Sequence, residues 1–169
     1  GAAAAPTAGL HFTGGLLRQI EAVGVRLARL TLHVGLGTFR PIQVERLDEH
    51  RMHAEWYEVL PDAAAAINAA RQAGGRVIAA GTTVVRTLET VADESGVVRP
   101  GSGMTELFIA PGYGFRAVDA MLTNFHLPRS SLLVMVSAFA GRERILVAYA
   151  EAIRERYRFY SYGDAMLIL

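Results

Sequence analysis

Hydrophobic and polar positions form their clearest pattern over residues 118–141. Along residues 118–125 the apolar Val118, Ala120 and Leu122 fall on one face and Asp119, Met121, Thr123 and Phe125 on the other, and this period of two predicts a β-strand. Residues 132–140 are instead apolar nearly all the way round a helix, so we expect a buried helix that Gly141 ends. The pattern therefore predicts a strand that leads into a core helix.

Polar side chains gather on and after this predicted strand. Asn124 and His126 stand at its end, and Ser130 or Ser131 can cap the following helix. Ligands of open α/β sheets bind at the carboxyl ends of the strands, so we expect Asn124 and His126 to line a ligand site. Asp119 lies inside the strand, where an unpaired carboxylate is costly to bury. It either pairs with a donor from the fold or faces the ligand.

Two other predicted strands also end beside residues suited to binding. Residues 25–34 alternate and end near His33, which precedes a glycine-containing loop. Residues 76–80 form a short apolar strand, and Gly81-Thr82-Thr83 turns it into a helix. Backbone N–H groups at such a helix start bind a carboxylate, phosphate or hydroxyl, and Arg86 can add charge-assisted hydrogen bonds. The alternative is an ordinary connection with an exposed arginine.

The remaining pattern completes the set of expected elements. Glycine and proline residues separate these elements, and one turn presents Tyr113 and Phe115. We expect further helices over residues 14–23, 61–73, 84–92 and 145–156, strands over residues 56–60, 104–110 and 165–169, and a surface loop over residues 93–103. Together they predict a single α/β domain, residues 1–169, with a mostly parallel or mixed sheet flanked by helices.

Composition and charge narrow the classes of function. Hydrophobic residues make up 51% of the 169 positions and charged residues 20%, which indicates a globular protein. All 17 basic residues are arginine, and the net charge of +1 gives no overall attraction for nucleic acid. An arginine-rich face over residues 142–158 either meets RNA phosphate or simply faces solvent. The absence of cysteine excludes disulfides and thiolate chemistry.

Neither a metal site nor a membrane segment is expected. His50, His53 and Glu55 lie close together in the sequence, but their spacing matches no zinc motif. The longest apolar run, residues 132–140, is too short to span a bilayer. The first residues, GAAAAP, lack the charged and apolar regions of a secretory signal, and the absence of an initial Met suggests a fragment.

Seven blocks of the sequence resemble the signature blocks of one family, in the family's order. They are PTAGLHFT (6–13), LHVGLGTF (32–39), MHAE (52–55), GTTVVRTLE (81–89), LFIAPGYGF (107–115), VDAMLTNFHLPRSSLLVMVSAFAG (118–141) and YRFYSYGDAMLIL (157–169). The chain is therefore similar to the S-adenosylmethionine:tRNA ribosyltransferase-isomerases of queuosine biosynthesis.

This resemblance implies a larger protein. Members of the family have a substantial N-terminal portion and an inserted small β-barrel domain that this chain lacks. We accordingly expect the chain to be the C-terminal part of a two-domain enzyme with a Rossmann-like or barrel-like large domain. We also expect the 169 residues alone to be inactive.

The resemblance further implies a reaction on tRNA that carries 7-aminomethyl-7-deazaguanine at the wobble position. The ribosyl part of S-adenosylmethionine is transferred to this amine and rearranged, which gives epoxyqueuosine and releases adenine and methionine. S-adenosylmethionine is then a ribosyl-donor substrate, and no cofactor or metal is expected. The resemblance also implies a cytoplasmic enzyme that contacts no membrane and is a monomer at full length.

The implied reaction gives the polar candidates specific roles. The sulfonium acidifies the neighbouring ribose carbon, so the reaction needs a base and a donor that helps adenine leave. We expect His126 or His33 to transfer protons, because histidine titrates near neutral pH, with Asp119 as orienter or base. The candidates for substrate binding are Gly81, Thr82, Thr83, Arg86, Asn124 and His11, with Tyr113 and Phe115 stacking on a base. For each histidine the alternative is a hydrogen-bonded packing residue.

Two other functions remain open at this point. A methyltransferase-type enzyme would also bind S-adenosylmethionine at the turn that begins with Gly81, but it would transfer the methyl group. A non-catalytic, truncated relative would bind tRNA or a protein partner and ignore the small molecule. Calorimetry with S-adenosylmethionine and with tRNA separately distinguishes such a module from an enzyme.

Overall fold

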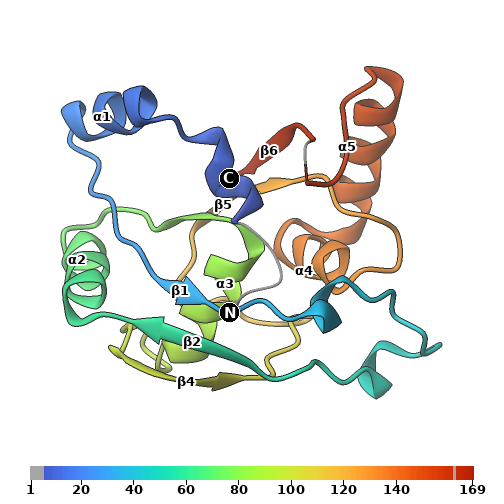
Figure 1. Ribbon diagram of the computed structural model, residues 1–169, viewed down its shortest axis with the longest axis horizontal. Helices are drawn as coiled ribbons and strands as arrows, with labels where there is room; N and C mark the ends of the chain where they lie inside the picture. Colours follow the sequence, from blue (N-terminus) through green and yellow to red (C-terminus); the bar gives the residue numbers. More distant parts are fainter. Residues whose placement is uncertain (1–5, 162) are drawn as a thin grey trace.

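The computed structural model describes residues 6–161 and 163–169, without the side chains of Leu36 and Phe39. Residues 1–5, where the sequence predicts no secretory signal, and Tyr162 of the last signature block lie outside the described part. The helices and strands are α1 (Gly14–Ala22), β1 (Thr31–Leu32), β2 (Glu55–Val59), α2 (Pro61–Gln72), β3 (Ile78–Ala80), α3 (Thr82–Val91), β4 (Gly101–Thr105), β5 (Ala120–Asn124), α4 (Ser131–Ala140), α5 (Arg142–Arg154) and β6 (Ala165–Ile168) (Figure 1). Short 3₁₀ helices occupy Thr7–His11, Leu36–Phe39 and Leu47–Glu49.

The strands of the described residues form two small sheets. The first has the order β1-β2-β4 and is antiparallel throughout. The second has the order β3-β5-β6, in which β5 is parallel to β3, with Ala80 opposite Leu122, and antiparallel to β6. The predicted α/β class with a mixed sheet flanked by helices is confirmed. The mostly parallel alternative is wrong, because β3 and β5 are the sole parallel pair among the described strands.

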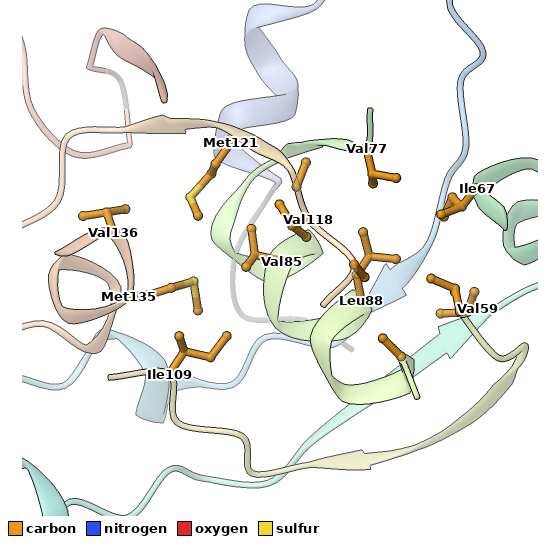
Figure 2. Packing of buried hydrophobic residues seen from close by; sticks show 14 of the residues in the cluster. Val59, Ile67, Val77, Val85, Leu88, Ile109, Val118, Met121, Met135 and Val136 are labelled. Atoms are coloured by element: carbon orange, nitrogen blue, oxygen red, sulfur yellow. The ribbon is translucent and has the colours of Figure 1, made fainter. Parts of the chain in front are cut away.

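Helix α3 lies between the two sheets and carries much of the core (Figure 1). Its Val85 and Leu88 side chains are 0% and 1% exposed. Figure 2 shows them packed among Val118 and Met121 from the β5 segment and Val59 from β2. Because one cluster of apolar side chains joins both sheets, α3 fixes the position of each sheet relative to the other.

Helix α4, which the sequence predicts as the buried core helix, is only half buried. Its predicted cap is confirmed, since the Ser130 side chain accepts a hydrogen bond from the Leu133 N–H. Met135 and Val136 point into the core (Figure 2), whereas most other residues of α4 keep some exposure. The prediction is wrong because α4 packs against α5 at one end of the core. The central helix is α3.

Two predicted strands also differ from the structure. The strand expected over residues 25–34 is reduced to β1, which pairs only with Tyr57 and Glu58 of β2. The strand expected over residues 104–110 lies earlier, at Gly101–Thr105, because β4 pairs with β2 along its whole length. After β4 the chain turns inward, and Ile109 is 1% exposed. The other predicted elements occur, with ends that differ by a few residues.

We expect Leu88→Ala to lower the free energy of unfolding by about 2–5 kcal/mol, because it opens a cavity between the two sheets. Leu146→Ala is the matched control, since Leu146 is 46% exposed on α5 and should cost about 0.5 kcal/mol or less. Urea titration followed by circular dichroism measures both. Equal losses in the two variants would show that α3 does not organise the core.

Candidate functional site

A cavity of about 380 Å³ opens where β3 and β5 end and α3 begins. Its volume falls within the range of about 300–1,000 Å³ that is typical of small-molecule sites. Because β3 and β5 are parallel, their carboxyl ends meet at this edge. The Gly81 N–H donates to the Leu122 carbonyl oxygen over 2.8 Å, which aligns the start of α3 with the end of β5. The cavity thus lies where the sequence predicts a ligand site.

Many of the candidate residues come together around this cavity. Those that line it are His33, Gly81, Thr82, Thr83, Asn124 and His126. His11 lies beside them, since its Nε2 atom is 3.2 Å from Nδ2 of Asn124. The sequence reasoning missed Thr38 and Thr123, which also line the cavity, because threonine carries no distinctive spacing signal. The chemical roles of all these residues stay predictions.

The first turn of α3 borders the cavity. Gly81, the N-cap, has a φ of +107°, a conformation that favours glycine. Its carbonyl oxygen accepts from the N–H groups of Val84 and Val85. The earlier N–H groups of a helix have no partner within the helix, and the helix dipole adds positive potential there. This end of the cavity therefore suits a carboxylate or a ribose hydroxyl.

His126 is buried at the end of β5, with 8% of its surface exposed. Its Nε2 atom is hydrogen-bonded to Thr123 Oγ1 at 2.9 Å, and its backbone N–H donates to the Tyr149 hydroxyl at 2.8 Å. Burial lowers the pKa of His126 to about 4, so the imidazole is neutral at pH 7. In the free protein the ring is therefore not an imidazolium acid, and one of its nitrogens carries a lone pair that can accept a proton.

His33 provides the second imidazole of the cavity in a different setting. Its backbone N–H donates to the Trp56 carbonyl oxygen over 2.8 Å, and the two rings lie 4.7 Å apart between centroids. The side chain is exposed, in contrast to that of His126. The strand β2 therefore holds His33 on the solvent side of the cavity.

Asn124 is held in one orientation by the segment that follows α5. Its Nδ2 group donates to the carbonyl oxygens of Tyr160 and Gly163, at 3.3 and 3.2 Å. Its Oδ1 atom is buried and has no hydrogen-bond partner among the described residues. A buried acceptor of this kind is costly unless a donor meets it. The Asn124 side chain is thus placed to accept from a ligand.

Asp119 does not line the cavity. It precedes β5, whereas Asn124 ends that strand, and five residues of strand span roughly 17 Å. Its Oδ2 atom accepts from the Val77 N–H over 2.7 Å and lies 3.8 Å from Nη1 of Arg71. The alternative in which Asp119 pairs with donors of the fold is the one observed.

The two aromatic candidates also lie away from the cavity. The Tyr113 hydroxyl donates to Glu89 over 3.3 Å, and burial together with this carboxylate raises the pKa of Tyr113 to about 12. Phe115 packs edge-on against Phe139 of α4, with 4.8 Å between ring centroids. Neither ring lines the cavity, because both pack against the core, so they are not placed to stack on a base there.

Arg86 supports the cavity wall rather than the ligand. Its guanidinium forms a buried ion pair with Glu55 of β2, and both side chains are almost fully buried. Glu55 also accepts from the Gly35 N–H at 2.6 Å and from Thr38 Oγ1 at 2.7 Å. Burial lowers the pKa of Arg86 to about 10. The ion pair thus fastens residues 35–38 to α3, and the exposed alternative for Arg86 is wrong.

Residues 6–161 and 163–169 contain neither a metal-binding cluster nor a membrane-spanning helix. No group of three or more His, Asp or Glu side chains in this part of the chain is arranged to hold a metal ion. No helix there is both long and apolar enough to cross a bilayer.

We expect Arg86→Met to lower the free energy of unfolding by about 3–5 kcal/mol, because it leaves the Glu55 carboxylate buried without a countercharge. Adding Glu55→Gln to this variant should recover part of the loss. The control is Arg154→Met, which removes exposed ion pairs to Glu151 and Glu155 and should cost about 1 kcal/mol or less. The expectation fails if Arg86→Met unfolds at the same denaturant concentration as this control.

We expect His126 to make stability depend on pH between about 7.5 and 5. Its pKa is about 4 in the folded protein and 6.5 for an exposed histidine, so the unfolded state binds more protons in this window. The stability contribution is complete at about pH 7.5 and falls as the pH drops through 6.5, by about 2 kcal/mol at pH 5. Chemical denaturation at pH 7.5 and at pH 5 should show that the free energy of unfolding falls less in His126→Gln than in the wild type. Identical pH profiles for the two proteins would contradict this origin.

Proteins of known sequence and structure resemble this chain over its whole length. A relative from Moorella thermoacetica, named S-adenosylmethionine:tRNA ribosyltransferase-isomerase, is 66% identical over 169 residues, which are 100% of this chain and 49% of the relative. One of the same name from Symbiobacterium thermophilum is 65% identical and covers 100% of this chain with 50% of its own length. The crystal structure of S-adenosylmethionine tRNA ribosyltransferase from Thermotoga maritima has a TM-score of 0.77 at 43% identity, over 96% of this chain and 51% of its own.

The chain therefore spans about half the length of the relatives that it matches. The sequence profile of the family described as queuosine biosynthesis protein matches residues 1–168. Both the identity with the relatives and this match confirm the resemblance found in the seven sequence blocks. The chain belongs to the queuosine biosynthesis protein family.

Proposed function

We propose that this chain carries the S-adenosylmethionine site of a tRNA ribosyltransferase-isomerase. The observation that carries the proposal is the polar cavity at the ends of β3 and β5, which brings two histidines, a helix N-terminus and a buried amide together in a chain of this family. The relatives bear the name of this activity. No cofactor is needed, because S-adenosylmethionine supplies the group that is transferred.

The proposed acceptor is tRNA that carries 7-aminomethyl-7-deazaguanine. Over the whole reaction the amine nitrogen forms a bond to the ribosyl group, and the carbon–sulfur bond breaks after the sulfonium has acidified the neighbouring carbon, with its electron pair leaving on methionine. The bond to adenine also breaks, and the ribosyl group rearranges to the epoxy-cyclopentane of epoxyqueuosine. Protons must leave the amine and the ribose carbon next to the sulfonium, and adenine must gain one.

The polar groups of the cavity fit the amino-acid end of S-adenosylmethionine. The first turn of α3 at Thr82 and Thr83 offers N–H donors to its carboxylate. Asn124 Oδ1, buried without a partner among the described residues, accepts from its ammonium group. These two contacts would fix the sulfonium and ribose beside the histidines.

The two histidines are the proposed proton-transfer groups. His126 is neutral near pH 7, so it accepts the proton from the ribose carbon or the amine. His33 is exposed at the other wall of the cavity and is the candidate to assist the departure of adenine. Asp119 has no part in this scheme, because its carboxylate is bound to the Val77 N–H at the opposite end of β5.

The test measures adenine release and the fate of the S-adenosylmethionine methyl group. The assay uses the chain itself and a chimera in which it replaces the matching half of the Moorella thermoacetica relative, each with the modified tRNA. We expect no adenine release from the chain itself; in the chimera, His126→Gln should reduce adenine release by 10²-fold or more, whereas Asp119→Asn, outside the cavity, should change it less than about threefold. Adenine release at the wild-type rate in His126→Gln would remove this residue from the mechanism.

The same assay separates the proposed function from its two rivals. Radiolabelled methyl should stay on released methionine, whereas a methyltransferase would move it to RNA or protein. Calorimetry with S-adenosylmethionine should show binding that Asn124→Ala weakens. A chain that binds tRNA but shows no heat with S-adenosylmethionine would instead be an RNA-binding module.

A further inference from the structure

A second, smaller recess adjoins the main cavity. Its volume is about 60 Å³, and Pro41 and Pro128 belong to its walls. The residues that it shares with the main cavity are Thr38, His126, Leu132 and Tyr160. The two hollows therefore meet around His126, which borders both. A group in the recess and a group in the cavity would approach the same imidazole from different sides.

Two loops that carry exposed arginines form the rim of this recess. Arg40 directly precedes Pro41, and Arg129 directly follows Pro128. The Ile42 N–H donates to the Arg129 carbonyl oxygen over 2.7 Å, which joins the two loops. Both arginine side chains are exposed, and neither forms an ion pair with a described residue. Two exposed arginines without an ion pair to a described residue thus stand directly beside Pro41 and Pro128 in the sequence.

The backbone of Arg129, in one of these loops, has an unusual conformation. Arg129 has a φ of +57°, in the left-handed region that side chains other than those of glycine, asparagine and aspartate seldom adopt. Such a conformation persists where the surrounding structure enforces it, and here the hydrogen bond from Ile42 does so. The chain keeps an arginine at a position where glycine would be less strained.

The arginine-rich face of α5 is a weaker site for an anion. Arg154 is paired with Glu151 and Glu155, and Arg158 is paired with Asp164. These acidic partners pair with two of the five arginines over residues 142–158, whereas Arg142, Arg144 and Arg156 form no ion pair with a described residue. Since the net charge of the chain is +1, attraction for RNA must come from local groups without acidic neighbours.

We propose that the recess admits the aminomethyl arm of the modified base of the RNA acceptor, with Arg40 and Arg129 contacting the phosphates on either side. This inference rests on the proposed function, because it assigns the acceptor of that reaction to a surface. A recess of about 60 Å³ is too small to enclose a nucleotide, so it takes a small arm on the base while the phosphates remain on the rim. Guanidinium groups bind phosphate oxygens in pairs, which suits both arginines.

The test compares the double variant Arg40→Gln/Arg129→Gln with the wild type. The probe is a tRNA transcript with guanosine at the wobble position, and its binding to the chain is followed by fluorescence anisotropy over a series of salt concentrations. We expect the Kd for the transcript to rise about tenfold and the slope of log K against log salt to fall by about 1.4–1.8, as for two lost phosphate contacts. The affinity for S-adenosylmethionine, measured by calorimetry, should change less than about twofold.

Arg76→Gln/Arg142→Gln is the matched control, because it removes two exposed arginines that likewise form no ion pair with a described residue. Arg76 precedes β3, at the opposite end from the cavity, and Arg142 begins α5. Equal effects of the two double variants, or no binding of the transcript by the wild type, would overturn the proposal. If the Arg40→Gln/Arg129→Gln variant loses affinity for the transcript but the wild type does not bind S-adenosylmethionine, the RNA contact at these arginines would be supported and the proposed function refuted.

Discussion

The buried ion pair between Glu55 and Arg86 joins the parts of the structure that enclose the cavity. Glu55 belongs to one sheet, Arg86 belongs to the central helix, and Thr38, which bonds to Glu55, lines the cavity. At the other end of α3, the Glu89 carboxylate accepts backbone N–H groups that include that of Val118, just before β5. A buried charge is tolerated only when it is paired and hydrogen-bonded, so these contacts must form together. The helix start that borders the cavity is therefore positioned by the same contacts that stabilise the core.

The sequence predicted where the candidate site lies better than it predicted which residues line it. Period-two alternation and a helix cap placed Asn124 and His126 at the end of a strand, and the structure has them there. Asp119 was grouped with them because it belongs to the same predicted strand, but it lies at the opposite end, next to donors from Val77 and Arg71. Alternation reports which residues share a strand, but it does not report which strand end borders a cavity.

Arg86 and α4 show why long-range partners limit such predictions. From its position one turn into α3, the sequence predicts that Arg86 binds a phosphate or carboxylate. Its actual partner, Glu55, is 31 positions away in the sequence and comes next to it only in the folded chain. Similarly, α4 is the more apolar helix, yet α3 is the one between the sheets, because its polar residues find buried partners. Arginine and glutamate as the charged residues of a helix that also carries Val85 and Leu88 indicate pairing within the core, and this signal was available in the sequence.

The electrostatics of the cavity and of its rim suit two different substrates of the proposed reaction. S-adenosylmethionine carries a sulfonium cation, which a positively charged wall would repel. No Arg, Asp or Glu side chain of the described residues lines the cavity, and burial keeps the pKa of His126 at about 4, so that its ring is neutral. RNA phosphates are instead attracted by positive charge, and Arg40 and Arg129, in the two loops that flank the recess, are exposed to solvent. With Arg86 neutralised by Glu55, positive charge is kept away from the sulfonium and presented where phosphates would approach. His126, which borders both hollows, is then the one imidazole placed to exchange protons with groups from each substrate.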